Sequence, residues 1–174
     1  MEPITNRPEV LIVHHSAVSR EDNPYQFYSI NQYHKQIGYP LSRFGFYCGY
    51  TFVVEPNGAI IRTRYDAEEG AHTLLGWNQK SIGICLTGDF YKEAPTEKQL
   101  RSLRTLIKKY NLPYLFHKEA DIRRTCAGRY LTHDIIDTET PPIDDTDKAK
   151  AIALSQKYNY PFEFLLKVIR SLKK

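Results

Sequence analysis

The sequence predicts an α/β protein in which helices flank a central mixed β-sheet. Short apolar runs of strand-forming residues occur together with segments whose apolar residues recur at helical spacing. Two of the runs surround Pro56-Asn57-Gly58, which is typical of a hairpin turn, whereas other runs are separated by helical segments. The 174 residues, of which 41% are hydrophobic and 25% charged, are enough for one core and one domain.

The first two elements are expected to be a strand and a helix. Residues 9–16, "EVLIVHHS", form a short apolar run of β-forming residues, so they predict a strand. Residues 23–40 follow Asp22 and carry apolar side chains at helical spacing, so they predict a helix. The residues at that spacing are Phe27, Ile30, His34 and Ile37.

The next elements are a hairpin and one more strand. Residues 48–64 contain two β-rich runs on either side of the turn, and residues 81–88, "SIGICLTG", form a further strand flanked by polar residues. A hairpin pairs its two strands antiparallel, whereas strands separated by helices commonly pair in parallel. We therefore expect a mixed sheet.

A second helix and a last short strand complete the predicted domain. Thr96 followed by Gln99 is the pattern of a capping box, which opens a helix over residues 96–111. Its apolar stripe consists of Leu100, Leu103 and Ile107. The run "YLFH" at residues 114–117 follows Pro113 and predicts a short strand.

The C-terminal part is expected to be separate from this domain. Residues 137–147, "DTETPPIDDTD", are acidic and contain proline, which favours a linker between a domain at 1–136 and a helical extension at 148–174. The end of the extension, residues 161–174, has an apolar helical stripe with basic residues beside it. We interpret it as a helix that packs on the domain, with binding to an anionic envelope as the alternative.

The net charge and the length of the apolar runs limit which kinds of partner the protein can have. The net charge of +4 arises from 24 basic and 20 acidic residues, which permits an anionic partner but is far from the composition of a nucleic-acid-binding protein. We expect neither a nucleic-acid partner nor stable membrane insertion, because no apolar run approaches the ~20 residues of a membrane span. The N-terminus lacks a secretory pattern, so synthesis in the cytoplasm is expected.

Three cysteines, Cys48, Cys85 and Cys126, fit reduced thiols better than a disulfide framework.

Histidines end two predicted strands, and a cysteine follows the second of them. "VHHS" at 13–16 carries His14 and His15, "YLFH" ends at His117, and Cys126 comes nine residues later. Two imidazoles and a thiolate suit zinc, and three protein ligands leave a fourth position open for water, as in catalytic zinc sites. The alternative is a set of core or surface histidines with a packed thiol, because neither a C-x-x-C nor an H-E-x-x-H motif is present.

Five stretches occur in an order that resembles the zinc N-acetylmuramoyl-L-alanine amidases of type 2. This family includes phage lysozyme-type endolysins and peptidoglycan recognition proteins. The resemblance covers roughly residues 9–130 and implies the amidase and peptidoglycan recognition protein fold. The stretches are "VHHSA", "SINQYHKQIGY", "GYTFVVEPNGAI", "GAHTLLGWNQKSIGICLTGDF" and "FHKEADIRRTCAG".

The resemblance also implies roles for particular residues. The zinc ligands would be His14, His117 and Cys126, with His15 as the alternative to His14. Tyr50 matches the active-site tyrosine, and His72 matches a position that lines the substrate groove.

The stretch before Cys126 departs from the family pattern. It is one residue longer than usual, and "CAG" replaces "CPG". The position that stabilises the oxyanion is therefore occupied by either Arg124 or Thr125. Glu119 is interpreted as a residue that supports the site or forms a turn, with a general base as the alternative.

The implied activity is zinc-dependent hydrolysis of the amide bond between N-acetylmuramic acid and L-alanine in bacterial peptidoglycan. We expect a monomeric endolysin or wall-lytic enzyme that reaches the cell wall after release or delivery. A cytoplasmic amidase that recycles muropeptides and a non-catalytic peptidoglycan-binding module are the alternatives. A binding module of this family typically lacks the cysteine ligand, so Cys126 favours the enzyme. A regulatory role on a polymerase has no sequence feature that supports it.

Overall fold

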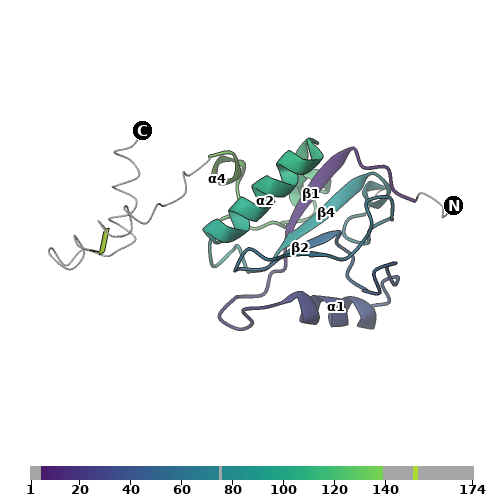
Figure 1. The fold of residues 1–174 in the computed structure, drawn as a ribbon, viewed down its shortest axis with the longest axis horizontal. Helices are drawn as coiled ribbons and strands as arrows, with labels where there is room; N and C mark the ends of the chain where they lie inside the picture. Colours follow the sequence, from purple (N-terminus) through teal and green to yellow (C-terminus); the bar gives the residue numbers. More distant parts are fainter. Residues whose placement is uncertain (1–4, 75, 139–150, 153–174) are drawn as a thin grey trace. The chain divides into compact units, whose positions relative to one another are not determined.

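The computed structural model describes residues 5–74, 76–138 and 151–152 (Figure 1). The chain divides into two compact units, Met1–Ile136 and Asp137–Lys174. The predicted linker and C-terminal helix lie almost entirely outside the described residues, so they remain predictions. No helix within the described part of the chain combines the length and the apolar character that a membrane span requires.

A mixed sheet of five strands forms the centre of the described part of the first unit, as predicted. Its strand order is β3-β2-β4-β1-β5, in which β1 pairs in parallel with β4 and β5, and β2 pairs in parallel with β4. The predicted hairpin is confirmed, since β2 and β3 pair antiparallel. The strands are β1 (Val10–His15), β2 (Phe52–Val54), β3 (Ile60–Arg62), β4 (Ser81–Leu86) and β5 (Tyr114–Phe116).

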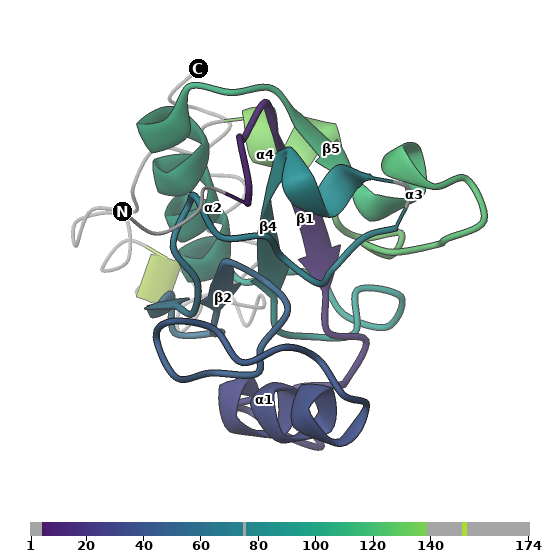
Figure 2. The same ribbon diagram turned by 90° about the vertical axis from the view of Figure 1, so that its right-hand side faces the viewer.

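Helices α1 (Phe27–Gln36) and α2 (Glu97–Tyr110) lie on opposite sides of this sheet (Figures 1 and 2). The predicted capping box opens α2: the Gln99 backbone N–H donates to Thr96 Oγ1 at 3.0 Å, and the Thr96 N–H donates to Gln99 Oε1 at 3.1 Å. Three shorter helices among the described residues were not predicted, because a helix of three to five residues is too short to show a hydrophobic periodicity in the sequence. They are η1 (Trp77–Gln79), α3 (His117–Ala120) and α4 (His133–Asp137).

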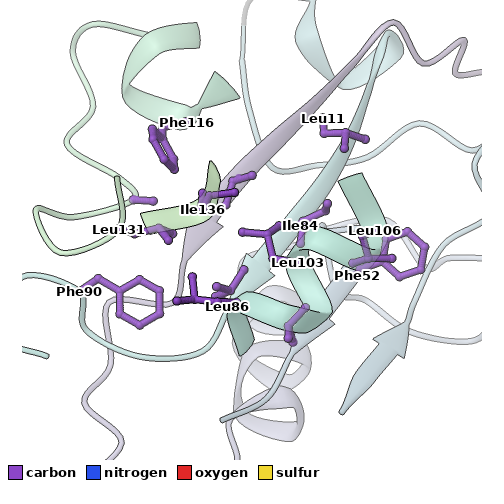
Figure 3. Close-up of a cluster of buried hydrophobic side chains, with 14 of the residues drawn as sticks. Leu11, Phe52, Ile84, Leu86, Phe90, Leu103, Leu106, Phe116, Leu131 and Ile136 are labelled. Carbon is purple, nitrogen blue, oxygen red and sulfur yellow. The ribbon is translucent and has the colours of Figure 1, made fainter. Parts of the chain in front are cut away.

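The hydrophobic core lies between α2 and the sheet (Figure 3). Leu100 and Leu103 are buried as predicted, and Leu106 is buried beside them. Ile107, which the predicted stripe included, is half-buried at the edge of the core. Burial of this apolar face stabilises the packing of α2 on the sheet, since burying each large apolar side chain contributes about 1.5–3 kcal/mol to the free energy of folding.

The apolar stripe of α1 does not pack into the core. Ile37 is 47% exposed, Phe27 and Ile30 are half-buried, and His34 is the buried member of the stripe. Ile30, His34 and Ile37 instead line clefts between α1 and the sheet. The helical period was therefore correct, but the stripe forms a wall that a ligand can reach.

A buried carboxylate holds α1 against the sheet. Glu55 lies at the end of β2 and accepts hydrogen bonds from Gln26 N at 3.2 Å, Phe27 N at 2.7 Å and Thr87 Oγ1 at 2.8 Å. The first two donors are at the N-terminus of α1, where backbone N–H groups lack partners within the helix. Glu55 thereby fixes one wall of the cleft.

We expect Glu55→Gln to lower the free energy of unfolding by about 1–3 kcal/mol, because an amide replaces a carboxylate that accepts three hydrogen bonds. Thermal and urea unfolding of the full chain measure the change. Glu21→Gln is the matched control, since Glu21 is exposed on the loop that leads to α1. Equal shifts in both variants would show that Glu55 does not hold the helix.

Candidate active site

The ends of two neighbouring parallel strands bring the histidines and the cysteine together. His14 lies near the end of β1, and His117 directly follows β5. Their rings are 4.6 Å apart between centroids, and Cys126 Sγ is 3.8 Å from His14 Nδ1. The potential ligand atoms of His14, His117 and Cys126 all lie within 4.8 Å of one another.

His14, rather than His15, belongs to this cluster. Successive side chains of a strand point to opposite faces, so only one of the two can face Cys126. The His15 ring stacks on Phe90, with centroids 5.8 Å apart, and its Nδ1 accepts a hydrogen bond from Phe90 N at 3.1 Å. The His15 backbone N–H contacts the cluster, since it donates to Cys126 Sγ at 3.3 Å.

His72 lies against the second nitrogen of His14. The distance from His14 Nε2 to His72 Nδ1 is 3.0 Å, and the His72 ring also contacts Thr73 Oγ1 at 3.0 Å and Ser81 Oγ at 3.4 Å. Gly83 of β4 makes room for this ring, since a Cβ there would approach the His72 Cδ2 atom to 2.5 Å. His72 lines the cleft, and its buried ring is placed to orient His14.

The environment of the cluster fits a bound zinc ion. Burial lowers the pKa of His14 well below its usual value, with further contributions from His72 and His117. Burial also lowers the pKa of His117 and raises the pKa of Cys126 to about 11. His117 Nε2 is buried and has no hydrogen-bond partner among the residues that the structure describes, which is costly unless a ligand occupies it. Zinc prefers neutral imidazole nitrogens and a cysteine thiolate, so its binding would release the Cys126 proton.

An open cleft of about 580 Å³ lies over the cluster. Tyr50 is half-buried in its wall, with its ring centroid 5.1 Å from that of His14. Burial raises the pKa of the Tyr50 phenol well above its usual value, so the hydroxyl stays protonated and can donate a hydrogen bond. The site therefore combines a three-ligand cluster with a donor beside it.

Arg124 and Thr125 both line the cleft. The Arg124 side chain is 51% exposed, and its Nε lies 3.6 Å from Asp121 Oδ2. The Thr125 carbonyl accepts a hydrogen bond from the Tyr91 hydroxyl at 2.8 Å. Both residues therefore remain candidates for oxyanion stabilisation.

Glu119 lies in α3, where it caps the helix, and is not among the described residues that line the cleft. Its carboxylate accepts a hydrogen bond from Phe116 N at 2.7 Å and lies 3.0 Å from His133 Nε2. These contacts agree with the preferred interpretation from the sequence.

His34 and Tyr39 are among the cleft residues that the sequence analysis does not recognise. His34 had been interpreted only as part of the α1 stripe, and Tyr39 was not singled out. The His34 ring stacks on Tyr39, with centroids 4.5 Å apart, and its Nδ1 accepts a hydrogen bond from Gly49 N at 3.0 Å. A histidine within an otherwise apolar stripe was the available signal.

The mixed sheet, its strand order and the cleft at the ends of its parallel strands define the fold of the amidases and peptidoglycan recognition proteins. The chain belongs to the N-acetylmuramoyl-L-alanine amidase family, whose match covers residues 4–141. The resemblance inferred from the sequence is thereby confirmed.

Relatives and a solved structure support this assignment. Peptidoglycan-recognition protein 2 of Holotrichia diomphalia is 34% identical over 95 residues, which cover 52% of this chain and 47% of that protein. The endolysin of Enterobacteria phage T3 is 31% identical over 104 residues, which cover 57% of this chain and 64% of that protein. The chain thus matches about half of the first relative and less than two thirds of the second. The structure of N-acetylmuramoyl-L-alanine amidase LysC from Clostridium intestinale URNW is similar with a TM-score of 0.63 and 27% identity, covering 77% of this chain and 85% of that one.

Proposed function

We propose that the protein hydrolyses the amide bond between N-acetylmuramic acid and L-alanine in bacterial peptidoglycan, in a zinc-dependent reaction, as an endolysin or related wall-lytic enzyme. The observation that carries this proposal is the cluster of His14, His117 and Cys126 on the floor of an open cleft. Membership of the amidase family supports the same bond as the target.

The zinc ion would be held by His14, His117 and Cys126. When bound, zinc supplies a Lewis acid for the lactyl carbonyl and lowers the pKa of a bound water towards ~7. His72 orients the His14 ring through its 3.0 Å contact, and the His15 N–H stabilises the Cys126 sulfur. Both contacts hold the ligands in place before a metal arrives.

Tyr50 is the proposed donor to the oxygen on which negative charge develops. Its protonated hydroxyl and its place beside His14 suit that role. Arg124 or Thr125, from the loop that precedes Cys126, is the second candidate donor.

Two alternatives remain distinct from a wall-lytic enzyme. A non-catalytic binding module would bind peptidoglycan without releasing stem peptides, and the presence of Cys126 in the cluster favours the enzyme over it. A recycling amidase would cleave small soluble muropeptides and leave intact sacculi uncut. Parallel digestion of purified sacculi and of soluble muropeptides separates the three, and the proposal predicts release of stem peptides from sacculi.

We expect His72→Ala to weaken zinc binding by about 10–100-fold, because the His14 ring loses the partner that orients it. Competition with a chromogenic chelator measures the affinity. His133→Ala is the control, since His133 is half-buried and pairs with Glu119 instead of the cluster. Unchanged zinc affinity in His72→Ala would remove His72 from the support of the metal site.

A further inference from the structure

The loop between α3 and Cys126 carries two arginines on one buried carboxylate. We call residues 121–125 the arginine loop. The Asp121 side chain is 3% exposed, and its two oxygens accept hydrogen bonds from Arg123 Nε at 2.8 Å and Arg123 Nη2 at 3.0 Å. Arg124 Nε lies 3.6 Å from the same carboxylate, and the Arg124 backbone N donates to the Asp121 carbonyl at 2.9 Å.

These contacts leave positive charge uncompensated at the rim of the cleft. The hydrogen bonds from Arg123 foremost lower the pKa of Asp121 to about 2, so the carboxylate is ionised. Arg123 occupies both oxygens in a bidentate pair, while the contact that Arg124 makes with this carboxylate is longer. One carboxylate thus serves two guanidinium groups, and within the described part of the chain Arg124 keeps donors available for a ligand.

Arg124 is also the member of the arginine pair that faces the site. It lines the cleft with Thr125, whereas Arg123 does not. Burial is the main cause of the lowered pKa of His117, and the positive charge of Arg124 is the second. The same charge partly offsets the rise that burial causes in the pKa of Tyr39. The described residues that line the cleft include no Asp or Glu. A cleft with a fixed cation and no carboxylate favours an anionic group on its ligand.

We propose that Arg124 determines specificity by binding the free carboxylate that lies nearest to the scissile bond. This inference rests on the proposed function. In a stem peptide the residue after L-alanine is D-glutamate joined through its side chain, so its α-carboxylate is free unless the wall carries D-isoglutamine there. A guanidinium distinguishes a carboxylate from the neutral amide by charge and by paired hydrogen bonds. Asp121 is a positioning residue that holds Arg124 at the rim.

Two N-acetylmuramoyl tripeptides test this inference. They are identical except that one carries D-glutamate and the other D-isoglutamine at the second position. Calorimetry on the full chain with Cys126→Ser measures binding without turnover. We expect the acid form to bind about ten-fold more tightly at low salt, and this preference should shrink as salt screens the exposed charge.

Three variants in the same background assign the preference. Arg124→Gln should abolish it, and Asp121→Asn should reduce it although Arg124 is still present. Arg129→Gln should retain it, because that variant removes an equal charge from an exposed residue outside the cleft lining. Equal binding of the two tripeptides by the parent, or an unchanged preference in Arg124→Gln, would overturn the inference.

Turnover by the zinc-loaded wild-type chain gives a second measurement, which applies even if Cys126→Ser does not fold. Arg124→Gln should raise KM for the acid substrate by about ten-fold and leave KM for the amide substrate unchanged. A fall in kcat that is equal for both substrates would instead place Arg124 in oxyanion stabilisation and refute the specificity role. Failure of the wild-type chain to bind or cut either tripeptide, or sacculi, would reject the proposed function, whereas cleavage without discrimination would reject only this inference.

Discussion

Loss of any one proposed zinc ligand is expected to abolish both zinc retention and amide cleavage, as tested by Cys126→Ser, His117→Ala and His14→Ala. The wild-type chain should carry about one zinc ion per molecule, held by these three side chains. Removal of one ligand leaves an incomplete site and, for the buried cluster, an unpaired polar group. Metal analysis after dialysis and an assay of released stem peptide measure the two losses.

The matched control is the neighbouring histidine. His15 makes its side-chain contact to Phe90 N, so His15→Asn, which keeps an acceptor, should retain zinc. Circular dichroism on every variant distinguishes loss of the metal from loss of the fold. Full activity in a metal-free protein would refute the zinc mechanism, and zinc loss in His15→Asn but not in His14→Ala would exchange the two histidines.

Tyr50→Phe is expected to retain zinc but to lower the rate by about ten- to a thousand-fold, which is the effect of removing one donor to a developing oxyanion. The phenol is protonated and close to His14, and phenylalanine keeps the ring while it removes the hydroxyl. Single-turnover kinetics on a soluble muropeptide measure the chemical step, with zinc content determined on the same sample.

Arg124→Ala and Thr125→Ala complete this comparison. The residue that supplies the second oxyanion donor should lower kcat for every substrate, whereas loss of a binding residue should raise KM. Unchanged turnover in Tyr50→Phe would remove Tyr50 from the mechanism.

Much of the fold could be predicted because its signals are local. The apolar runs of β1 and β4, the hairpin turn at Asn57-Gly58 and the capping box at Thr96 each specify an element within a few residues. The position of α1 could not be predicted in this way. Periodicity shows that a helix has an apolar stripe, but only tertiary contacts show whether core or cleft lies beside Ile30 and Ile37.

The candidate site was predicted in part. Histidines at strand ends indicated a shared edge, but the sequence could not choose between His14 and His15 because a shift of one residue reverses the face of a strand. The contact of His72 with His14 joins segments that come together only in three dimensions. The contact of Arg124 with Asp121 depends on the path of a loop that is one residue longer than the family pattern. Such support contacts have no sequence pattern of their own.

Mass spectrometry of sacculi digested by the zinc-loaded wild-type chain tests the central claim most directly, with Cys126→Ser as the blank. We expect glycan strands with free lactyl carboxyl groups and stem peptides with a free N-terminal L-alanine, both absent from the blank. Intact lactyl–alanine bonds, with cuts only in the glycan, only within the peptide, or nowhere, would contradict it.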